Sequence, residues 1–254
     1  ICMSNKINLI SKKIYRKIIK IISGRRSLIA QMVITNERIV AKRLRPTRGC
    51  YLQFGAGLPS VISFYDGVKL FDKNLNYNMY IFDTFTGPPM NYDINDKSSV
   101  SIKNDIEYSK LWNYGGVDKF KKNLSNASPV TGSKVDLNFV TLVPGAIQET
   151  TKNFIIPNNE DIGIVNIDLG SKSYDSVLSV LEFLKPHLKN YTLFFFDDIH
   201  SYAGNPHVGA LGALNAFNNK YKNECGIVKC PIFSGKKVTP EQIFVDEVYW
   251  SWVK

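Results

Sequence analysis

The chain has 254 residues, of which 44% are hydrophobic and 12% aromatic, enough to form a sizeable core and to exclude a wholly disordered protein. Its length fits one α/β domain with additions, or at most two small domains. Of the 32 basic and 22 acidic residues, 13 basic and one acidic lie in the first 50, so the net charge of +10 divides into +12 there and −2 elsewhere. A nucleic-acid enzyme would carry its basic groove in the catalytic domain, so we expect no nucleic-acid partner.

The N-terminal fifth of the chain is predicted to be helical. Between residues 6 and 23, isoleucines recur at steps of three and four opposite a basic face, which indicates an amphipathic helix. A second helix is predicted over 28–44, before Pro46. Two interpretations of the extension 1–48 stay open: packing on the body or on a second copy in a homo-oligomer, or contact of residues 1–24 with an anionic membrane surface.

Hydropathy and cysteine usage favour a cytoplasmic protein. No apolar run reaches the ~18 residues of a membrane span, and basic residues interrupt the N-terminal apolar stretch, unlike a signal peptide. The four cysteines are too few for a disulfide scaffold and lack metal-binding spacing.

From residue 49 to 254, short apolar runs alternate with segments of helical length. Strands are predicted at 51–54, 79–82, 139–143, 162–167, 193–196, 227–233 and 243–250, and helices at 58–71, 146–154, 174–188 and 207–222. The alternation predicts a Rossmann-like α/β fold with a doubly wound, mostly parallel seven-stranded sheet, whose last two strands form an antiparallel hairpin. The polar insertion 84–137, partly helical near 104–125, is expected to be a lid or substrate loop.

A glycine-containing turn follows the first strand. Gly55 and Gly57 would let a ligand approach the backbone, and the next helix begins where anionic groups are favoured, although such turns also need glycine for their own geometry. Asp83 ends the second strand, where a carboxylate can accept both hydroxyls of a ribose, or can simply cap a turn. Together these features favour an adenosine-containing cofactor.

Three carboxylates follow two neighbouring strands. Asp168 comes after the fourth strand, and Asp197 and Asp198 come after the fifth, so all three are expected at the carboxyl edge of the sheet. Clustered carboxylates repel one another unless a cation binds them, and oxygen ligands suit Mg²⁺, Mn²⁺ or Ca²⁺. The alternative is a set of solvated acids that cap the following helices.

Proton acceptors for a reaction at this edge are also present. His200 follows the acidic pair and would be a general base, an outer group of a metal site, or a polar loop residue. Lys172 lies close enough to Asp168 in sequence to reach the same pocket, or is solvent-exposed. Asp168 itself is the third candidate for taking a proton.

A family resemblance rests on the ordered segments YLQFG (51–55), IFDTFTGPP (81–89), YGGVDKF (114–120), VTLVPG (140–145), ID (167–168), LEFLKP (181–186) and FDD (196–198). They resemble the signatures of the macrocin O-methyltransferase family, class I enzymes that use S-adenosylmethionine. The resemblance covers about residues 50–220. It implies methyl transfer to a hydroxyl, usually of a sugar, with Mg²⁺ bound by the acids matching Asp168, Asp197 and Asp198.

The same resemblance implies which residues bind S-adenosylmethionine. They lie in the first two matching segments and are Gln53, Gly55, Gly57, Asp83, Thr84 and Phe85. Gln53 and Ala146 replace acids that are found in the family, and the loop after Asp168 is two residues longer than the family pattern. That loop is more similar to catechol O-methyltransferase, in which a lysine near the position of Lys172 is the base.

The predicted function is therefore a Mg²⁺-dependent O-methyltransferase acting on a small-molecule or glycan acceptor. The replacements at Gln53 and Ala146 leave open a non-catalytic homologue that binds a nucleoside or serves as an assembly partner. Nucleic-acid methylation would need an Asn/Asp-Pro-Pro-Tyr type of motif, and the Pro-Pro of this chain follows the wrong strand for it.

Overall fold

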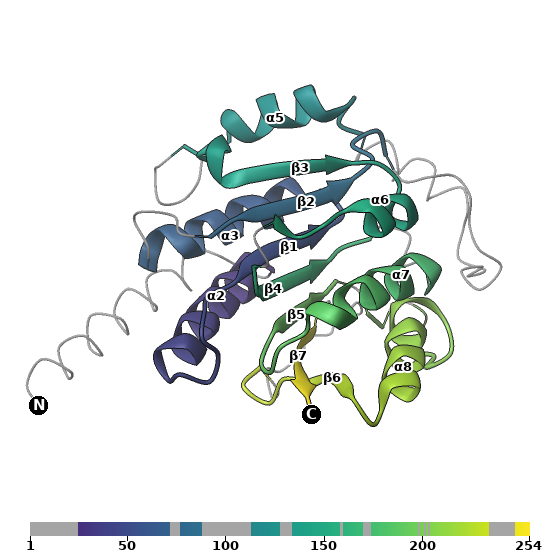
Figure 1. Cartoon of the computed structure of the whole chain (residues 1–254). Helices are drawn as coiled ribbons and strands as arrows, with labels where there is room; N and C mark the ends of the chain where they lie inside the picture. The colour runs from purple at the N-terminus through teal and green to yellow at the C-terminus, as the bar shows by residue number, and fades with distance from the viewer. Residues whose placement is uncertain are drawn as a thin grey trace, which may run out of the picture.

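A computed structural model describes residues 25–71, 77–87, 113–127, 134–157, 160–169, 174–197, 199–200, 202, 204–233 and 247–254. Within these ranges one sheet has the strand order β3-β2-β1-β4-β5-β7-β6 (Figure 1). Its strands are β1 (Cys50–Phe54), β2 (Met79–Asp83), β3 (Val140–Pro144), β4 (Ile162–Ile167), β5 (Leu193–Phe196), β6 (Cys225–Lys229) and β7 (Glu247–Val253). The first five are parallel, and β7 runs antiparallel between β5 and β6. The predicted doubly wound, mostly parallel sheet is confirmed.

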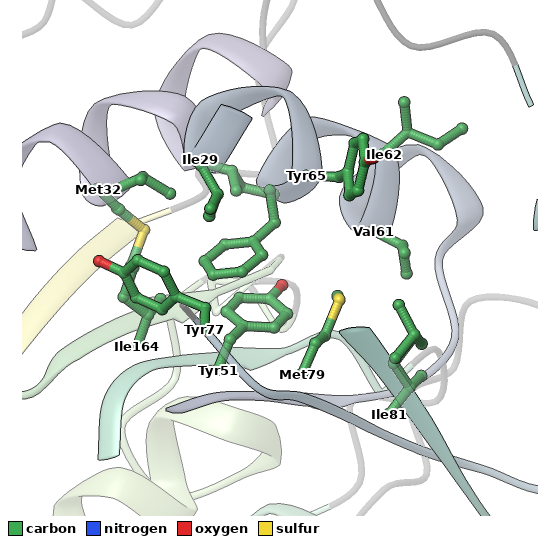
Figure 2. Packing of buried hydrophobic residues seen from close by; sticks show 14 of the residues in the cluster. Ile29, Met32, Tyr51, Val61, Ile62, Tyr65, Tyr77, Met79, Ile81 and Ile164 are labelled. Carbon is green, nitrogen blue, oxygen red and sulfur yellow. The ribbon is translucent and has the colours of Figure 1, made fainter. Parts of the chain in front are cut away.

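Helices cover both faces of the sheet (Figure 1). One layer contains α2 (Arg25–Ala41), α3 (Leu58–Phe71) and α5 (Val117–Ser125), and the other contains α6 (Ile147–Asn153), α7 (Tyr174–Leu184) and α8 (Gly209–Tyr221). Alternate strand residues serve the two layers: Tyr51 belongs to the first core, and Leu52 and Phe54 to the second. Figure 2 shows Ile29 and Met32 of α2 packed in the first core. No helix in the described ranges is both long and apolar enough to cross a bilayer.

Several element ends differ from the predicted ones for local reasons. Helix α2 ends at Ala41, whereas the prediction placed its end at residue 44. It ends in a Schellman motif, in which the Leu44 N–H donates to the Ile39 carbonyl and Arg43 adopts a left-handed φ of 59°. The helix predicted over 174–188 ends at Leu184 and continues as one 3₁₀ turn, η4 (Lys185–His187), at Pro186, which has no N–H to donate.

The last hairpin is confirmed with shifted ends. The strand predicted over 227–233 is Cys225–Lys229. The Cys230 N–H still donates to the Val248 carbonyl of β7, but Pro231 follows and has no N–H with which to extend the ladder. The strand predicted over 243–250 is Glu247–Val253, and residues 243–246 lie outside the described ranges. The insertion 84–137 is described in part, and α5 covers the C-terminal part of the helix predicted near 104–125.

The part of the basic extension that is described packs into the body of the protein. Met32 and Val33 of α2 have no exposed surface and belong to the same core as β1 and α3. This is the packing interpretation of the sequence, realised for residues 25–41. Residues 1–24, to which the membrane interpretation applied, lie outside the described ranges.

Arg45 connects this extension to the amino edge of the sheet. It is only 2% exposed, and burial lowers its pKa, although nearby Tyr77 and acidic groups oppose the effect. Its guanidinium donates to the side-chain oxygen of Asn36 and to the carbonyl oxygens of Thr47 (2.9 Å), Arg48 (3.0 Å), Tyr191 (3.1 Å) and Gly163 (3.4 Å). One cation of the N-terminal fifth therefore satisfies backbone groups of the sheet.

Arg45→Met should lower the free energy of unfolding by about 3 kcal/mol or more, because buried carbonyl groups would lose their donor. Urea denaturation measures this loss. The control Lys42→Met removes an exposed charge nearby and should change the free energy by less than about 0.5 kcal/mol. A loss below about 1 kcal/mol in Arg45→Met would show that water or other groups replace the guanidinium.

Candidate active site

The carboxyl ends of β1 and β4 approach each other closely. The Asp168 N–H donates to the Phe54 carbonyl at 2.8 Å, and Gly55, the residue that follows β1, has a φ of +95°. A Cβ on Gly55 would lie 1.9 Å from the backbone oxygen of Asp168. Only glycine fits both the conformation and the space, so the fold itself requires glycine at this position.

The second glycine of the turn borders the side chain of Asp168. A Cβ on Gly57 would lie 2.8 Å from Oδ2 of Asp168 and 3.1 Å from Oγ of Ser60. That hydroxyl is buried and has no hydrogen-bond partner among the described residues. The absence of a side chain at Gly57 therefore lets the Asp168 carboxylate and the Ser60 hydroxyl come close to the backbone at the start of α3.

Asp83 connects the ends of β1 and β2. Its Oδ2 accepts the Ala56 N–H at 2.7 Å, and its Oδ1 accepts the Phe85 N–H at 2.5 Å. Burial raises the pKa of Asp83, and these hydrogen bonds act in the opposite direction. The predicted ribose-binding carboxylate thus lies directly beside the glycine turn.

The other predicted cofactor residues contact the chain around this turn. Gln53 is buried beneath the turn, where it donates to the Gly55 carbonyl at 2.8 Å and accepts from Tyr51 at 3.0 Å. Thr84 donates to the Gly87 carbonyl at 2.6 Å. Phe85 is buried with a φ of 57° and packs against Phe120, with ring centroids 5.1 Å apart. Their contacts with a cofactor stay predictions.

Tyr114 belongs to this site and was not recognised as a site residue from the sequence. Its hydroxyl accepts the Leu58 N–H at the start of α3, at 3.4 Å. Burial raises its pKa, and the charges of Asp83 and Asp168 raise it further. Its only sequence signal was its place in the family-like segment YGGVDKF (114–120).

The predicted metal ligands Asp168 and Asp197 lie at adjacent strand ends. They directly follow the paired residues Ile167 and Phe196, and the Asp197 N–H donates to the Ile167 carbonyl at 3.0 Å. Among the described residues, no three carboxylate, histidine or cysteine side chains gather closely enough to hold a metal ion. Asp198 lies outside those residues, as does the candidate base Lys172.

His200 is paired with a residue that the sequence did not reveal. Its Nε2 lies 3.2 Å from Oε2 of Glu247, which also accepts the Tyr249 hydroxyl at 2.7 Å and, through Oε1, the ammonium of Lys229. Because β7 is antiparallel, Glu247 lies opposite Phe196, at the same sheet edge as Asp197. Burial alone would raise the pKa of Glu247, but the hydrogen bonds from Lys229 and Tyr249 and the nearby positive charges lower it.

Gly55→Ala and Gly57→Ala should differ in stability. At Gly55 the new methyl group would overlap backbone atoms at an unfavourable φ, so we expect a loss of about 2–4 kcal/mol. At Gly57 it meets only the side chains of Asp168 and Ser60, which can turn aside, so we expect a loss of about 1 kcal/mol or less. Urea denaturation compares the two variants, and equal losses would contradict this account.

The stabilising contribution of Glu247 should depend on pH. Because its pKa is lowered in the folded protein, this contribution is present above the ordinary value of 4.5 and is lost as the pH falls through the folded value. Glu247→Gln should therefore be less stable than wild type at neutral pH, by about 1 kcal/mol after solvent screening, and this difference should vanish in acid.

Urea denaturation at neutral and acidic pH measures that difference. Glu224→Gln is the control, because it breaks an ion pair with Lys185 in which the carboxylate is 60% exposed, and its effect at neutral pH should be much smaller. A stability difference for Glu247→Gln that is the same at both pH values would mean that the carboxylate's charge is not responsible.

Comparison with known proteins identifies the fold. No family model matches the sequence, and no curated protein is significantly similar to it. The O-methyltransferase NovP superposes with a TM-score of 0.55 and 15% identity, over 91% of this chain and 80% of that chain. The calicheamicin methyltransferase CalS11 superposes with a TM-score of 0.51 and 16% identity, over the same shares. The chain therefore has the Rossmann-like fold of these two methyltransferases.

Proposed function

We propose that the chain is an S-adenosylmethionine-dependent O-methyltransferase that methylates a hydroxyl of a sugar or another small polyhydroxylated acceptor. One observation carries the proposal. The glycine turn after β1 brings the carboxylate of Asp168 beside Gly57 at the start of α3, with Asp83 at the neighbouring strand end. The fold shared with NovP and CalS11 supports it.

The residues present fit this cofactor. Asp83 would accept the ribose hydroxyls beside the glycine turn, which is where this kind of fold binds nucleotides. The negative charge of Asp168 beside Gly57 suits the ammonium group of the amino-acid end. When bound, S-adenosylmethionine supplies an electrophilic methyl group on a sulfonium. The role of the protein is then to hold the acceptor oxygen in line with that methyl group and to exclude water.

We further propose that Asp168, Asp197 and Asp198 hold Mg²⁺ or a similar divalent cation. The register of β4 and β5 supports it, since Asp168 and Asp197 follow paired residues. Carboxylate oxygens are the ligands that such cations prefer. A bound divalent cation would lower the pKa of an acceptor hydroxyl, which makes the hydroxyl easier to deprotonate.

Asp168, Lys172 and His200 are the candidates for accepting the proton of the acceptor hydroxyl. The pairing of His200 with Glu247 supports His200, because a carboxylate on one ring nitrogen orients the imidazole. The other ring nitrogen, Nδ1, lies beside Gly204, and a Cβ built on Gly204 would be 3.8 Å from it. Because residue 204 is glycine, it has no side chain that could cover Nδ1.

Methyl transfer tests the proposal directly. The full chain is incubated with S-adenosylmethionine, Mg²⁺ and a panel of nucleotide sugars and catechols, and S-adenosylhomocysteine is measured by mass spectrometry. We expect turnover with at least one acceptor and its loss in EDTA. Asp197→Asn should lower turnover by about 100-fold or more, because a metal ligand is removed.

Asp136→Asn is the matched control, because Asp136 is an exposed capping residue far from the carboxyl edge and asparagine also caps helices well. Turnover that persists unchanged in EDTA would overturn the metal role. Binding of S-adenosylhomocysteine without turnover on any acceptor would favour the non-catalytic nucleoside-binding homologue.

A further inference from the structure

The side chain of Gln53 lies directly beneath the glycine turn that follows β1. It is fully buried, and its Nε2 donates to the Gly55 carbonyl at 2.8 Å, with the Gly57 carbonyl 3.5 Å away. The Gly55 oxygen also accepts the Gly57 N–H at 3.1 Å. Because Gln53 has no exposed surface, it acts on anything bound at the turn through the groups that it holds.

A single peptide plane connects Gln53 to Asp83. The carbonyl of Gly55 and the N–H of Ala56 belong to the same peptide unit, which is planar and trans. Its oxygen accepts from Gln53, and its N–H, on the opposite side of the peptide, donates to Oδ2 of Asp83 at 2.7 Å. A rotation of this peptide would disturb both hydrogen bonds, so Gln53 and Asp83 hold it from its two sides.

The orientation of the Gln53 amide is fixed in turn. The Gly55 carbonyl can only accept a hydrogen bond, so it takes the NH₂ group, and Oε1 is left to accept the Tyr51 hydroxyl at 3.0 Å. That hydroxyl accepts from Nδ2 of Asn166, the residue paired with Gln53 on β4, at 3.1 Å. The Tyr51 ring stacks on Phe64 of α3, with centroids 3.8 Å apart. These contacts join β4, β1 and α3 behind the turn.

The chemistry required of residue 53 is that of an amide. The side chain must accept from the Tyr51 hydroxyl and donate to the Gly55 carbonyl, and an amide group does both. An ionised glutamate would accept from the hydroxyl but has no N–H for the carbonyl. A buried amide with both ends bonded is held rigidly, so it can fix the position of the groups that it contacts.

The carboxylate of Asp83 is the group on which this network acts. Its Oδ1 accepts the Phe85 N–H at 2.5 Å and its Oδ2 accepts the Ala56 N–H, so each oxygen is held by one backbone N–H. A carboxylate has about four lone-pair sites, so both oxygens can accept from a ligand as well. A carboxylate that is already oriented loses less entropy when it accepts the two hydroxyls of a ribose.

We propose that Gln53 is a positioning residue for ribose recognition: it holds the Gly55–Ala56 peptide, and this peptide holds the carboxylate of Asp83 in the direction that the ribose hydroxyls need. The proposal rests on the proposed function, in which Asp83 accepts those hydroxyls. Gln53 thereby sets how strongly the site prefers a ribonucleoside to a deoxyribonucleoside, without touching either ligand.

Calorimetry with S-adenosylhomocysteine and its 2′-deoxy analogue measures this preference without an acceptor. Wild-type protein should bind S-adenosylhomocysteine about 10-fold more tightly, because the analogue lacks a hydrogen bond to a charged group. Gln53→Met keeps the length of the side chain but removes the amide, and the preference should fall to about 3-fold or less. A preference that stays at the wild-type value in Gln53→Met would overturn the proposal.

Thr192→Val is the matched control. Thr192 is buried at the amino edge of the sheet, where its hydroxyl donates to the Ile162 carbonyl at 3.0 Å, so this variant also replaces a buried donor by an apolar group. It should leave the preference unchanged. If both variants lower the preference equally, the cause is a general loss of stability, and the role of Gln53 is overturned.

Tyr51→Phe provides a second variant in case Gln53→Met does not fold. It removes only the hydroxyl that fixes the Gln53 amide, so the preference should fall in the same direction by about 2-fold. An unchanged preference in Tyr51→Phe, with Gln53→Met unfolded, would count against the proposal.

Hydrogen exchange of the Ala56 amide, followed by NMR, tests the same link in the free protein. In Gln53→Met the Ala56 N–H should exchange about 10-fold faster, because its peptide is no longer held from the carbonyl side. Thr192→Val should leave this rate unchanged. Equal Ala56 rates in wild type and Gln53→Met would overturn the proposal, whatever the ligands show.

Failure of the proposed function would look different from failure of this inference. If the proposed function fails, wild-type protein binds neither ligand, which overturns both proposals. If only the role of Gln53 fails, wild-type protein binds S-adenosylhomocysteine and prefers it to the 2′-deoxy analogue, and Gln53→Met keeps that preference.

Discussion

The close approach of β1 and β4 at their carboxyl ends is the constraint on which the candidate site depends. A missing Cβ at Gly55 lets the backbone of Asp168 pass within contact distance, and the Asp168 N–H closes this junction on the Phe54 carbonyl. The same junction brings the side chain of Asp168 beside Gly57. With a larger residue at position 55, the two strands would have to separate, and the carboxylate would no longer border the start of α3.

The opposite edge of the sheet is held by a different interaction. Arg45 and Asn36 bind to each other and to backbone groups there, and Asn36 also donates to the Tyr77 hydroxyl at 2.9 Å. Glu37 accepts from that hydroxyl at 2.6 Å and pairs with Arg48. Part of the basic charge of the N-terminal fifth is therefore structural, because Arg45 and Arg48 bind groups of the fold itself.

The insertion takes part in the site through aromatic packing. Phe85, Phe120 and Tyr114 form a continuous set of contacts from the end of β2 to α5 and back to the start of α3. This explains why a segment with few strong local signals is well placed in the fold. The described part of the insertion around α5 is positioned by the packing of these rings, of which Phe85 and Phe120 are fully buried, and by the backbone hydrogen bond from Gly116 to Phe85.

The sequence by itself determined the strand and helix order, the glycine turn, and the acids at the ends of β2, β4 and β5, because hydrophobic periodicity and turn chemistry are local properties. It did not determine the end of α2, where Arg43 adopts a left-handed backbone conformation that is usual for glycine. Nor could it pair His200 with Glu247 or Tyr114 with Leu58. Those pairs join residues far apart in the chain, and only the register of the antiparallel β7 and the packing of α5 bring them together.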